Sequence, residues 1–321
     1  MNRAATGAKA LDADKALAWL RDRGVYVAFV LLVILNLLIT PQFATTGTLF
    51  NVLVQTAPVL LVSLGMALAI GTEGIDLSVG SVMALASATI YLYLGYGGPV
   101  AMVVALFAGS LSGLVAGSLV AFVGVQPLVA TLALLVGVRG LAQLMINGQL
   151  EPITDPTIVT LGQGTLVGVP ISVIIAAAAA LIIWFVVQRT TFGRYVVAIG
   201  DNRSASLLSG HPVRQTLLLV YIISGMLAAL AGIVASARIQ ASDASNIGYL
   251  IELSAIAAVV VGGTPLTGGK VSIAGTVMGA LLMQLINTTF VANDLPYTYA
   301  EILTAMIILA AVYIQRGRGA V

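Results

Sequence analysis

The sequence predicts an all-α, polytopic membrane protein with about ten transmembrane helices, some of them interrupted. Of the 321 residues, 60% are hydrophobic and only 8% are charged, whereas a soluble domain carries about 25% charged residues. The mean hydropathy is +1.08. Apolar runs near the ~20 residues that a helix needs to cross a bilayer recur along the chain. Because so few charges cannot cover a water-exposed surface, we expect the lipid bilayer to surround most of the protein.

Ten apolar segments are predicted to cross the membrane, and the eighth is shorter than a full crossing. They lie at residues 25–40, 52–71, 78–95, 99–123, 127–147, 170–188, 216–236, 252–263, 271–290 and 297–315. The chain then divides into an N-terminal segment (1–24), a transmembrane domain (25–315) with its largest loop at 189–215, and a tail (316–321). The N-terminal segment has mixed charge and lacks the short apolar core of a cleavable signal peptide.

The distribution of lysine and arginine predicts the orientation, because short cytoplasmic loops are enriched in these residues. With ten spans, the N-terminal segment, the 189–215 loop, the turn at Lys270 and the tail all fall on one side. These segments hold twelve of the fourteen basic residues. We therefore expect both termini in the cytoplasm. If the eighth span were absent, Arg316 and Arg318 would fall outside.

Small residues predict close helix packing in the fourth span. Gly109, Gly113 and Gly117 recur on one helix face, a spacing that lets helix backbones approach each other. Arg139 lies within the fifth span, where a charge needs a partner or water. We expect it to pair with Glu73 or Asp76.

The stretch GTEGIDLSVGS, residues 71–81, interrupts two apolar runs with glycines and two carboxylates. Asp76 can cap the start of the third span, where exposed N–H groups and the helix dipole favour an anion. Alternatively, the unwound backbone can line a cavity, since broken helices are tolerated only against protein or water. The two interpretations are compatible.

A second interruption, VVVGGTPLTGGKVS at 259–272, superficially resembles a phosphate-binding loop. That motif requires Gly-Lys-Ser/Thr four residues after its first glycine. Here Gly269 stands where the lysine belongs, Lys270 comes one place late, and Val271 replaces the hydroxyl residue. We therefore expect no nucleotide site in this chain.

The 189–215 loop is predicted to contain a short helix, SASLLSG, between the turn signals GDN and GHP. Its Leu207 and Leu208 have nothing obvious to pack against except a partner protein. His211 is the only histidine and there is no cysteine, so we expect no metal, no cofactor and no catalytic site. The net charge of +2 gives no reason to expect a nucleic-acid partner.

Several polar residues within the spans are candidates for contact with a neutral solute that crosses the membrane. Each could equally make a hydrogen bond between helices, worth under about 1 kcal/mol. These candidates are Asn51, Gln55, Gln126, Thr131 and Asn287.

Four stretches resemble a known family. They are GIDLSVGS (74–81), QPLVATLALLVGVRGLAQ (126–143), FGRYVVAIGDNRSASLLSG (192–210) and IELSAIAAVVVGGTPLTGG (251–269). In this order they resemble the permease subunits of bacterial ATP-driven sugar importers of the ribose type, which are more distantly related to branched-chain amino acid permeases. The resemblance covers about residues 25–315.

The resemblance implies a permease of the bacterial inner membrane that works with three kinds of partner. A cytoplasmic ATPase supplies energy, an extracytoplasmic binding protein delivers a monosaccharide, and a second permease, identical or paralogous, completes the pathway. It also implies that the two interruptions belong to the pathway, which adds Gly74, Asp76, Ser78 and Thr264 to the candidates. The implied ATPase-coupling residues are Gly200, Asn202, Ser206, Leu207, Leu208, Ser209 and Gly210.

Some residues depart from the family pattern. Glu73 stands where a small or neutral residue is expected, Ser254 replaces an aspartate, Val271 replaces a glycine, and His211-Pro212 replaces Ile-Asn. The pieces GVRGLAQLMINGQ and SDASNIGYLIELSAI are most similar to permeases for furanose-form sugars.

Three alternative functions stay open at the level of sequence. One is a proton-coupled secondary transporter that uses Glu73 or Asp76 as its carrier carboxylate. Another is an ATP-driven permease for a different small polar solute, such as a branched-chain amino acid. The third is a membrane enzyme or scaffold, for which the sequence offers no supporting chemistry.

Overall fold

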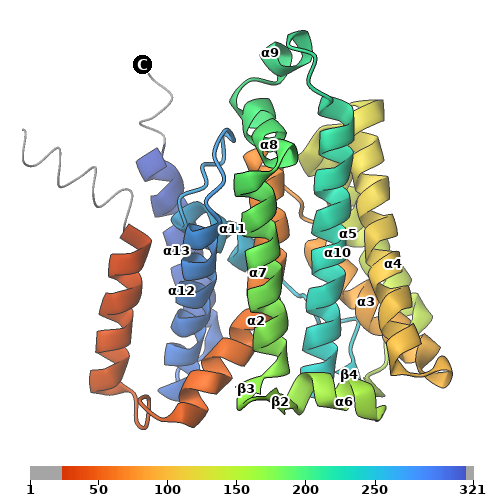
Figure 1. The fold of residues 1–321 in the computed structure, drawn as a ribbon. Helices are drawn as coiled ribbons and strands as arrows, with labels where there is room; N and C mark the ends of the chain where they lie inside the picture. Colours follow the sequence, from red (N-terminus) through yellow and green to blue (C-terminus); the bar gives the residue numbers. More distant parts are fainter. Residues whose placement is uncertain (1–23, 316–321) are drawn as a thin grey trace, which may run out of the picture.

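Long apolar helices build the protein, and the computed structural model describes residues 24–315 (Figure 1). Within these residues, seven helices are long and apolar enough to cross a membrane. Their bounds are α2 (Thr46–Gly71), α3 (Val79–Tyr93), α4 (Gly98–Ser118), α5 (Pro127–Met145), α7 (Ile171–Arg189), α10 (Val213–Ile239) and α12 (Ile273–Ala292). Three further helices are a shorter first helix (Gly24–Ile39), α11 (Ile251–Val261) and α13 (Tyr297–Gln315).

Short elements cap the two ends of this bundle. At one end lie α8 (Thr191–Asp201) and α9 (Arg203–Leu208), and at the other lies α6 (Pro156–Gln163) with the strands (Figure 1). Strand β1 (Glu151–Pro152) pairs antiparallel with β4 (Ala241–Ser242), and β2 (Thr165–Leu166) pairs antiparallel with β3 (Val169–Pro170). A single 3₁₀ turn, η1 (Leu94–Tyr96), extends α3, and a π-helical turn, η2 (Leu119–Val123), extends α4.

Each of the ten predicted segments coincides with one of these helices. The predicted helix in the 189–215 loop is present as α9, but α8 before it was not predicted. Its Gly193, Val196 and Ile199 are buried, because this face packs against the ends of α2, α7 and α10. The predicted N-terminal segment, apart from Gly24, and the tail lie outside the described residues.

The core is centred on α2, α3 and α10. In an apolar 18-residue stretch of each helix, with η1 counted as part of α3, 78% of the residues are buried in α2 and 67% in α3 and in α10. The corresponding share is only 22% in α5 and 28% in α7. A helix that is hydrophobic all round and largely buried belongs to the centre of a bundle. The outward faces of α5 and α7 are therefore left for lipid or another protein.

Glycines bring α4 and α10 together, as the spacing of Gly109, Gly113 and Gly117 predicts. A Cβ on Gly113 would collide with the backbone carbonyl of Tyr221 in α10. Gly109 and Gly117 face α10 in the same way. The packing interpretation of this glycine series is confirmed.

Candidate functional site

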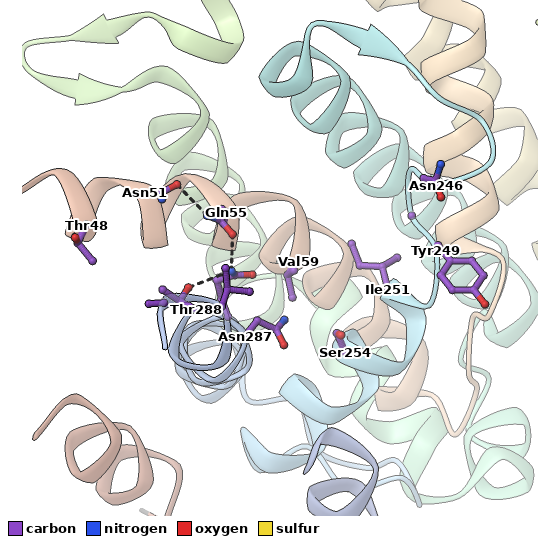
Figure 2. Close-up of a pocket in the computed structure, with 14 residues that line it drawn as sticks. Thr48, Asn51, Gln55, Val59, Asn246, Tyr249, Ile251, Ser254, Asn287 and Thr288 are labelled. Carbon is purple, nitrogen blue, oxygen red and sulfur yellow. Dashed lines mark hydrogen bonds between the residues drawn. The ribbon is translucent and has the colours of Figure 1, made fainter. Parts of the chain in front are cut away.

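A cavity of about 600 Å³ opens among α2, α11, α12 and the segment that precedes α11 (Figure 2). Its volume lies in the range of about 300–1,000 Å³ that is usual for small-molecule sites. The lining consists of Thr48, Asn51, Gln55 and Val59 of α2, Asn246, Gly248 and Tyr249 of the preceding segment, Ile251 and Ser254 of α11, and Gln284, Asn287, Thr288, Val291 and Ala292 of α12.

The cavity lining is polar but uncharged. Nine of its fourteen residues have an amide, hydroxyl or phenol side chain, and none is acidic or basic. Amides and hydroxyls offer both donors and acceptors of hydrogen bonds, but they provide no counter-ion. The lining therefore suits a neutral ligand that is rich in hydroxyl groups better than a charged one.

A chain of amides connects α2 with α12. Gln55 Nε2 donates to Asn51 Oδ1 at 2.9 Å, and Gln284 Nε2 donates to Gln55 Oε1 at 3.0 Å (Figure 2). Gln284 Nε2 also donates to Thr288 Oγ1 at 3.4 Å. Gln284 uses both of its N–H groups in these bonds, but Gln55 has a second N–H and all three amide oxygens have further lone pairs, so the network keeps capacity for a bound ligand.

The segment before α11 is held in shape by its own aspartate. Asp243 accepts hydrogen bonds from the backbone N–H of Ser245 and of Asn246, both at 3.0 Å, and from Asn246 Nδ2 at 2.7 Å. The segment then passes through positive φ at Gly248 and Leu250 before α11 begins. This turn places Asn246 and Tyr249 at the cavity.

Arg139 also binds this segment, which corrects the expected pairing with Glu73 or Asp76. Its guanidinium donates to the backbone carbonyls of Ala244, Ser245, Ile247 and Gly248, and no ion pair joins it to a carboxylate of the described residues. The reason is helix geometry. Pro127, at the start of α5, lies beside Gly74, and twelve residues of helix place Arg139 about 18 Å further along the axis. The predicted ion pair is wrong.

Three predicted pathway residues, Asn51, Gln55 and Asn287, line the cavity together. Six other polar residues of the lining were not predicted: Thr48, Asn246, Tyr249, Ser254, Gln284 and Thr288. A signal for the α12 group exists, because positions 284, 287, 288 and 291 follow the spacing of one helix face. Ser254 stood out in the sequence only as a departure from the family pattern.

A second group of predicted residues surrounds the link between α2 and α3, away from the cavity. Asp76 is 1% exposed. Its carboxylate accepts from the Ser78 N–H at 3.0 Å, from Ser78 Oγ at 2.6 Å and from Ser224 Oγ at 2.7 Å. Thr131 Oγ1 donates to the Ile75 carbonyl at 3.1 Å, and Gly74 packs below the Tyr221 hydroxyl. Asp76 thus stabilises the turn that leads into α3, but it does not cap the helix itself, because the N-cap residue is Ser78 and no side chain of the described residues binds an N–H of α3 there.

The remaining pathway candidates lie apart from both groups. Gln126 is exposed at the N-cap of α5, where its side chain makes no capping bond. Thr264 is fully buried, and its Oγ1 accepts from the Ser272 N–H at 3.0 Å, which closes the 262–272 loop. Glu73 is exposed on the α2–α3 link, with φ of 64°.

The predicted coupling residues divide into a framework and an exposed tip. The Asn202 side chain caps α9 by accepting from the Ala205 N–H at 2.9 Å, and buried Ser206 donates to the Ala198 carbonyl at 2.9 Å. Gly210 has φ of 77° just after α9. The tip consists of Ser209 with Leu207 and Leu208, and the two leucines are 54% and 90% exposed.

Glycines join this loop to both interruptions. The Gly269 N–H donates to the Gly71 carbonyl at 3.2 Å. A Cβ on Gly200 of α8 would collide with that same carbonyl. The end of α2, the 262–272 loop and α8 therefore form one close-packed junction, at the end of the bundle where α8 and α9 lie (Figure 1).

Comparison with known proteins identifies this arrangement. Residues 48–312 match the family described as the permease component of the branched-chain amino acid transport system. The chain belongs to this permease family. It is accordingly a multi-pass membrane protein. No solved structure matches the chain.

The relatives of this permease include several sugar permeases. The galactofuranose transporter permease protein of Escherichia coli is 38% identical over 302 residues, which cover 91% of this chain and 89% of the relative. The ribose import permease protein of Escherichia coli is 38% identical over 307 residues (93% and 94%). The fructose import permease protein of Bifidobacterium longum is 35% identical over 309 residues (89% and 86%).

Proposed function

We propose that this protein is the membrane-spanning subunit of an ATP-driven importer and forms the pathway for a neutral monosaccharide. The observation that supports this most directly is the uncharged, amide- and hydroxyl-rich cavity between α2, α11 and α12. The ribose, galactofuranose and fructose permeases that it resembles have names consistent with such a solute.

The cavity also favours a sugar over an amino acid, although the family takes its name from amino acid transport. A zwitterion carries a carboxylate and an ammonium, and each loses its hydration on entering a site. Burying such charges without partners is costly. The cavity lining contains no acidic or basic side chain, so an amino acid would find no counter-ion there.

The geometry supports a direction for the pathway. We infer that both termini and the α8–α9 loop face the cytoplasm, with ten spans in all, because the basic residues gather in those segments. The cavity lies between the first half of α2 and the second half of α12, toward the end of the bundle opposite α8 and α9 (Figure 1). A sugar released by an extracytoplasmic binding protein would enter there.

Two further partners complete the proposed importer. The exposed leucines of α9 would dock on a cytoplasmic ATPase, and the glycine junction would transmit its movement to the end of α2 and the 262–272 loop. A second permease, identical or paralogous, would pack against this one. The ATPase holds the nucleotide, so this chain would need no cofactor or catalytic group of its own.

The environment of Asp76 favours proton-coupled transport less than it favours the importer proposed above. Its carboxylate is bound by a backbone N–H and two hydroxyls, and it lies outside the cavity lining. A proton carrier must exchange protons with both sides and contact the solute pathway. Asp76 does not line the cavity and is 1% exposed, so this structure gives it no contact with the proposed solute pathway.

The test is uptake by the reconstituted importer. Partners captured from native membranes by affinity purification would be identified, purified and assembled with this permease in liposomes. We expect ATP-dependent uptake of a labelled neutral monosaccharide and no uptake of leucine or valine. Uptake without ATP, or of amino acids alone, would overturn the proposal.

The furanose preference stays a prediction and needs its own comparison. Methyl furanosides and methyl pyranosides of the same sugar cannot interconvert, so each reports on one ring form. We expect the furanoside to compete with uptake more strongly. Equal competition would remove the preference while leaving the monosaccharide assignment intact.

A further inference from the structure

The most unusual side chain near the cavity is Arg139, a guanidinium within an apolar helix. Its Nη1 donates to the carbonyls of Ala244, Ser245 and Ile247 at 3.1, 3.2 and 3.3 Å. Its Nη2 donates to the Gly248 carbonyl at 3.1 Å. One side chain of α5 thus binds four carbonyls of a single short segment.

That segment, residues 243–250, forms one wall of the cavity and is called the wall segment below. It supplies Asn246, Gly248 and Tyr249 to the lining. It has no regular secondary structure between β4 and α11. The carbonyls of Asp243 and Asn246 accept from backbone N–H groups of the same segment, but the carbonyls of Ala244, Ser245, Ile247 and Gly248 have no backbone partner among the described residues. Arg139 binds these four instead.

The chemistry of arginine explains why this residue occupies the position. A guanidinium presents five N–H donors in a rigid, planar fork, whereas a lysine offers a compact ammonium on a flexible stem. Carbonyls that diverge around a turn can be bound together by a fork. Arg139 has no ion pair with a carboxylate of the described residues, so the four carbonyls are its direct hydrogen-bond partners, while the carboxylates of Glu252 and Asp243 act on its charge from further away.

We propose that Arg139 is a positioning residue that fixes the wall segment, and thereby sets the affinity of the cavity for its sugar. The residue does not line the cavity itself; it acts through the backbone of residues 244–248. This inference rests on the proposed function for the identity of the ligand, but the positioning role can be measured without any sugar.

The first experiment measures uptake kinetics of the complete importer with Arg139→Gln, Arg139→Lys and a control, Arg238→Gln. Arg238 lies near the end of α10 on the same side of the bundle, outside the cavity lining. We expect Arg139→Gln to raise KM about tenfold or more, the scale of lost hydrogen bonds from a charged donor. Basal ATP hydrolysis should be unchanged, and Arg139→Lys should restore part of the affinity.

Two results of this experiment would overturn the proposal. One is an unchanged KM in Arg139→Gln. The other is an equal change in Arg238→Gln, since it would show that the loss of a positive charge, rather than the position of the wall segment, matters.

A second experiment reports on the wall segment directly. The chain has no cysteine, so a single Ile247→Cys substitution gives one labelling site, at a side chain that is only 6% exposed. Labelling by a membrane-impermeant maleimide should be slow, and it should become about tenfold faster when Arg139→Gln is added, as expected for a local opening that loses charged hydrogen bonds. Equal labelling rates would overturn the positioning role, whatever solute the permease carries.

Discussion

Gly80 of α3 and Gly248 of the wall segment pack so closely that a Cβ on either residue would collide with the carbonyl oxygen of the other. Gly80 belongs to the GIDLSVGS stretch, and Gly248 has φ of 71° and lines the cavity. The wall segment is therefore held from two sides, by Arg139 of α5 and by the first turn of α3. A movement of α3 should therefore displace the wall segment and change the shape of the cavity.

Gly80→Ala is expected to displace the wall segment and lower uptake. The new methyl group would meet the Gly248 carbonyl and the Glu252 carboxylate, and overpacking of this kind costs about 1–3 kcal/mol. Thermal unfolding in detergent and sugar uptake would both be measured, and both should decrease.

The matched control is Gly137→Ala on α5, where an added Cβ meets nothing within 4 Å. In a helix interior, alanine is more favourable than glycine by about 1 kcal/mol, so this variant should be as stable as the native protein or more so. If Gly80→Ala were equally well tolerated, the close packing of Gly80 and Gly248 would not constrain the wall segment.

Gln284→Met is expected to weaken sugar binding without unfolding the protein. Gln284 is 6% exposed and connects Gln55 with Thr288. Methionine has a similar length but removes the donor, which leaves Gln55 Oε1 without its partner. A loss of ~1 kcal/mol per hydrogen bond is about fivefold in apparent affinity. The measurement is the KM for sugar uptake.

Gln149→Met serves as the comparison for that variant, because Gln149 is exposed and lies outside the cavity lining. Its KM should equal the native value. An unchanged KM in Gln284→Met as well would mean that the amide network does not contact the sugar.

The sequence predicted the helices well because apolar segments of the length of a bilayer have few alternatives. The same physics explains the correct prediction of the glycine series Gly109, Gly113 and Gly117, since only small residues permit the approach of α4 to α10. The positions of Asn51 and Gln55 on one face of α2 also follow from helical spacing, because residues four apart are neighbours.

Contacts between segments that are far apart in the sequence cannot be predicted from hydropathy and helical spacing. Arg139 is predicted to form an ion pair with Glu73 or Asp76, whereas it binds backbone carbonyls of a segment more than a hundred residues later in the sequence. Which carbonyls lack partners depends on the turn at Gly248, and sequence periodicity does not report on such a turn. Gln284 and Thr288 were missed because a polar residue in an apolar helix is ambiguous until its neighbouring helix is known.

Asp76→Asn, combined with Glu73→Gln, is expected to leave the pH dependence of uptake unchanged. The asparagine keeps one oxygen acceptor for Ser78, and the Ser224 hydroxyl can rotate to accept from the new amide. Some loss of stability is expected, because the carboxylate accepts three hydrogen bonds that an amide can only partly replace. Uptake would be measured across the neutral pH range, with and without an imposed proton gradient. A gradient-driven component that disappears in this variant would favour proton-coupled transport.

Leu208→Glu is expected to separate the permease from its ATPase while leaving its insertion in the membrane intact. Leu208 is 90% exposed on α9, so the free permease should tolerate the charge. In the proposed interface the same carboxylate would be buried without a partner, at a cost of roughly 3 kcal/mol, or about a hundredfold in affinity. Affinity capture should therefore recover less ATPase, and uptake should fall to background. Val167→Glu, at a 95% exposed position in the β2–β3 turn at the opposite end, should retain the ATPase. If Leu208→Glu retained it too, α9 would not be the docking element, because a buried unpaired carboxylate at the contact could not leave the affinity unchanged.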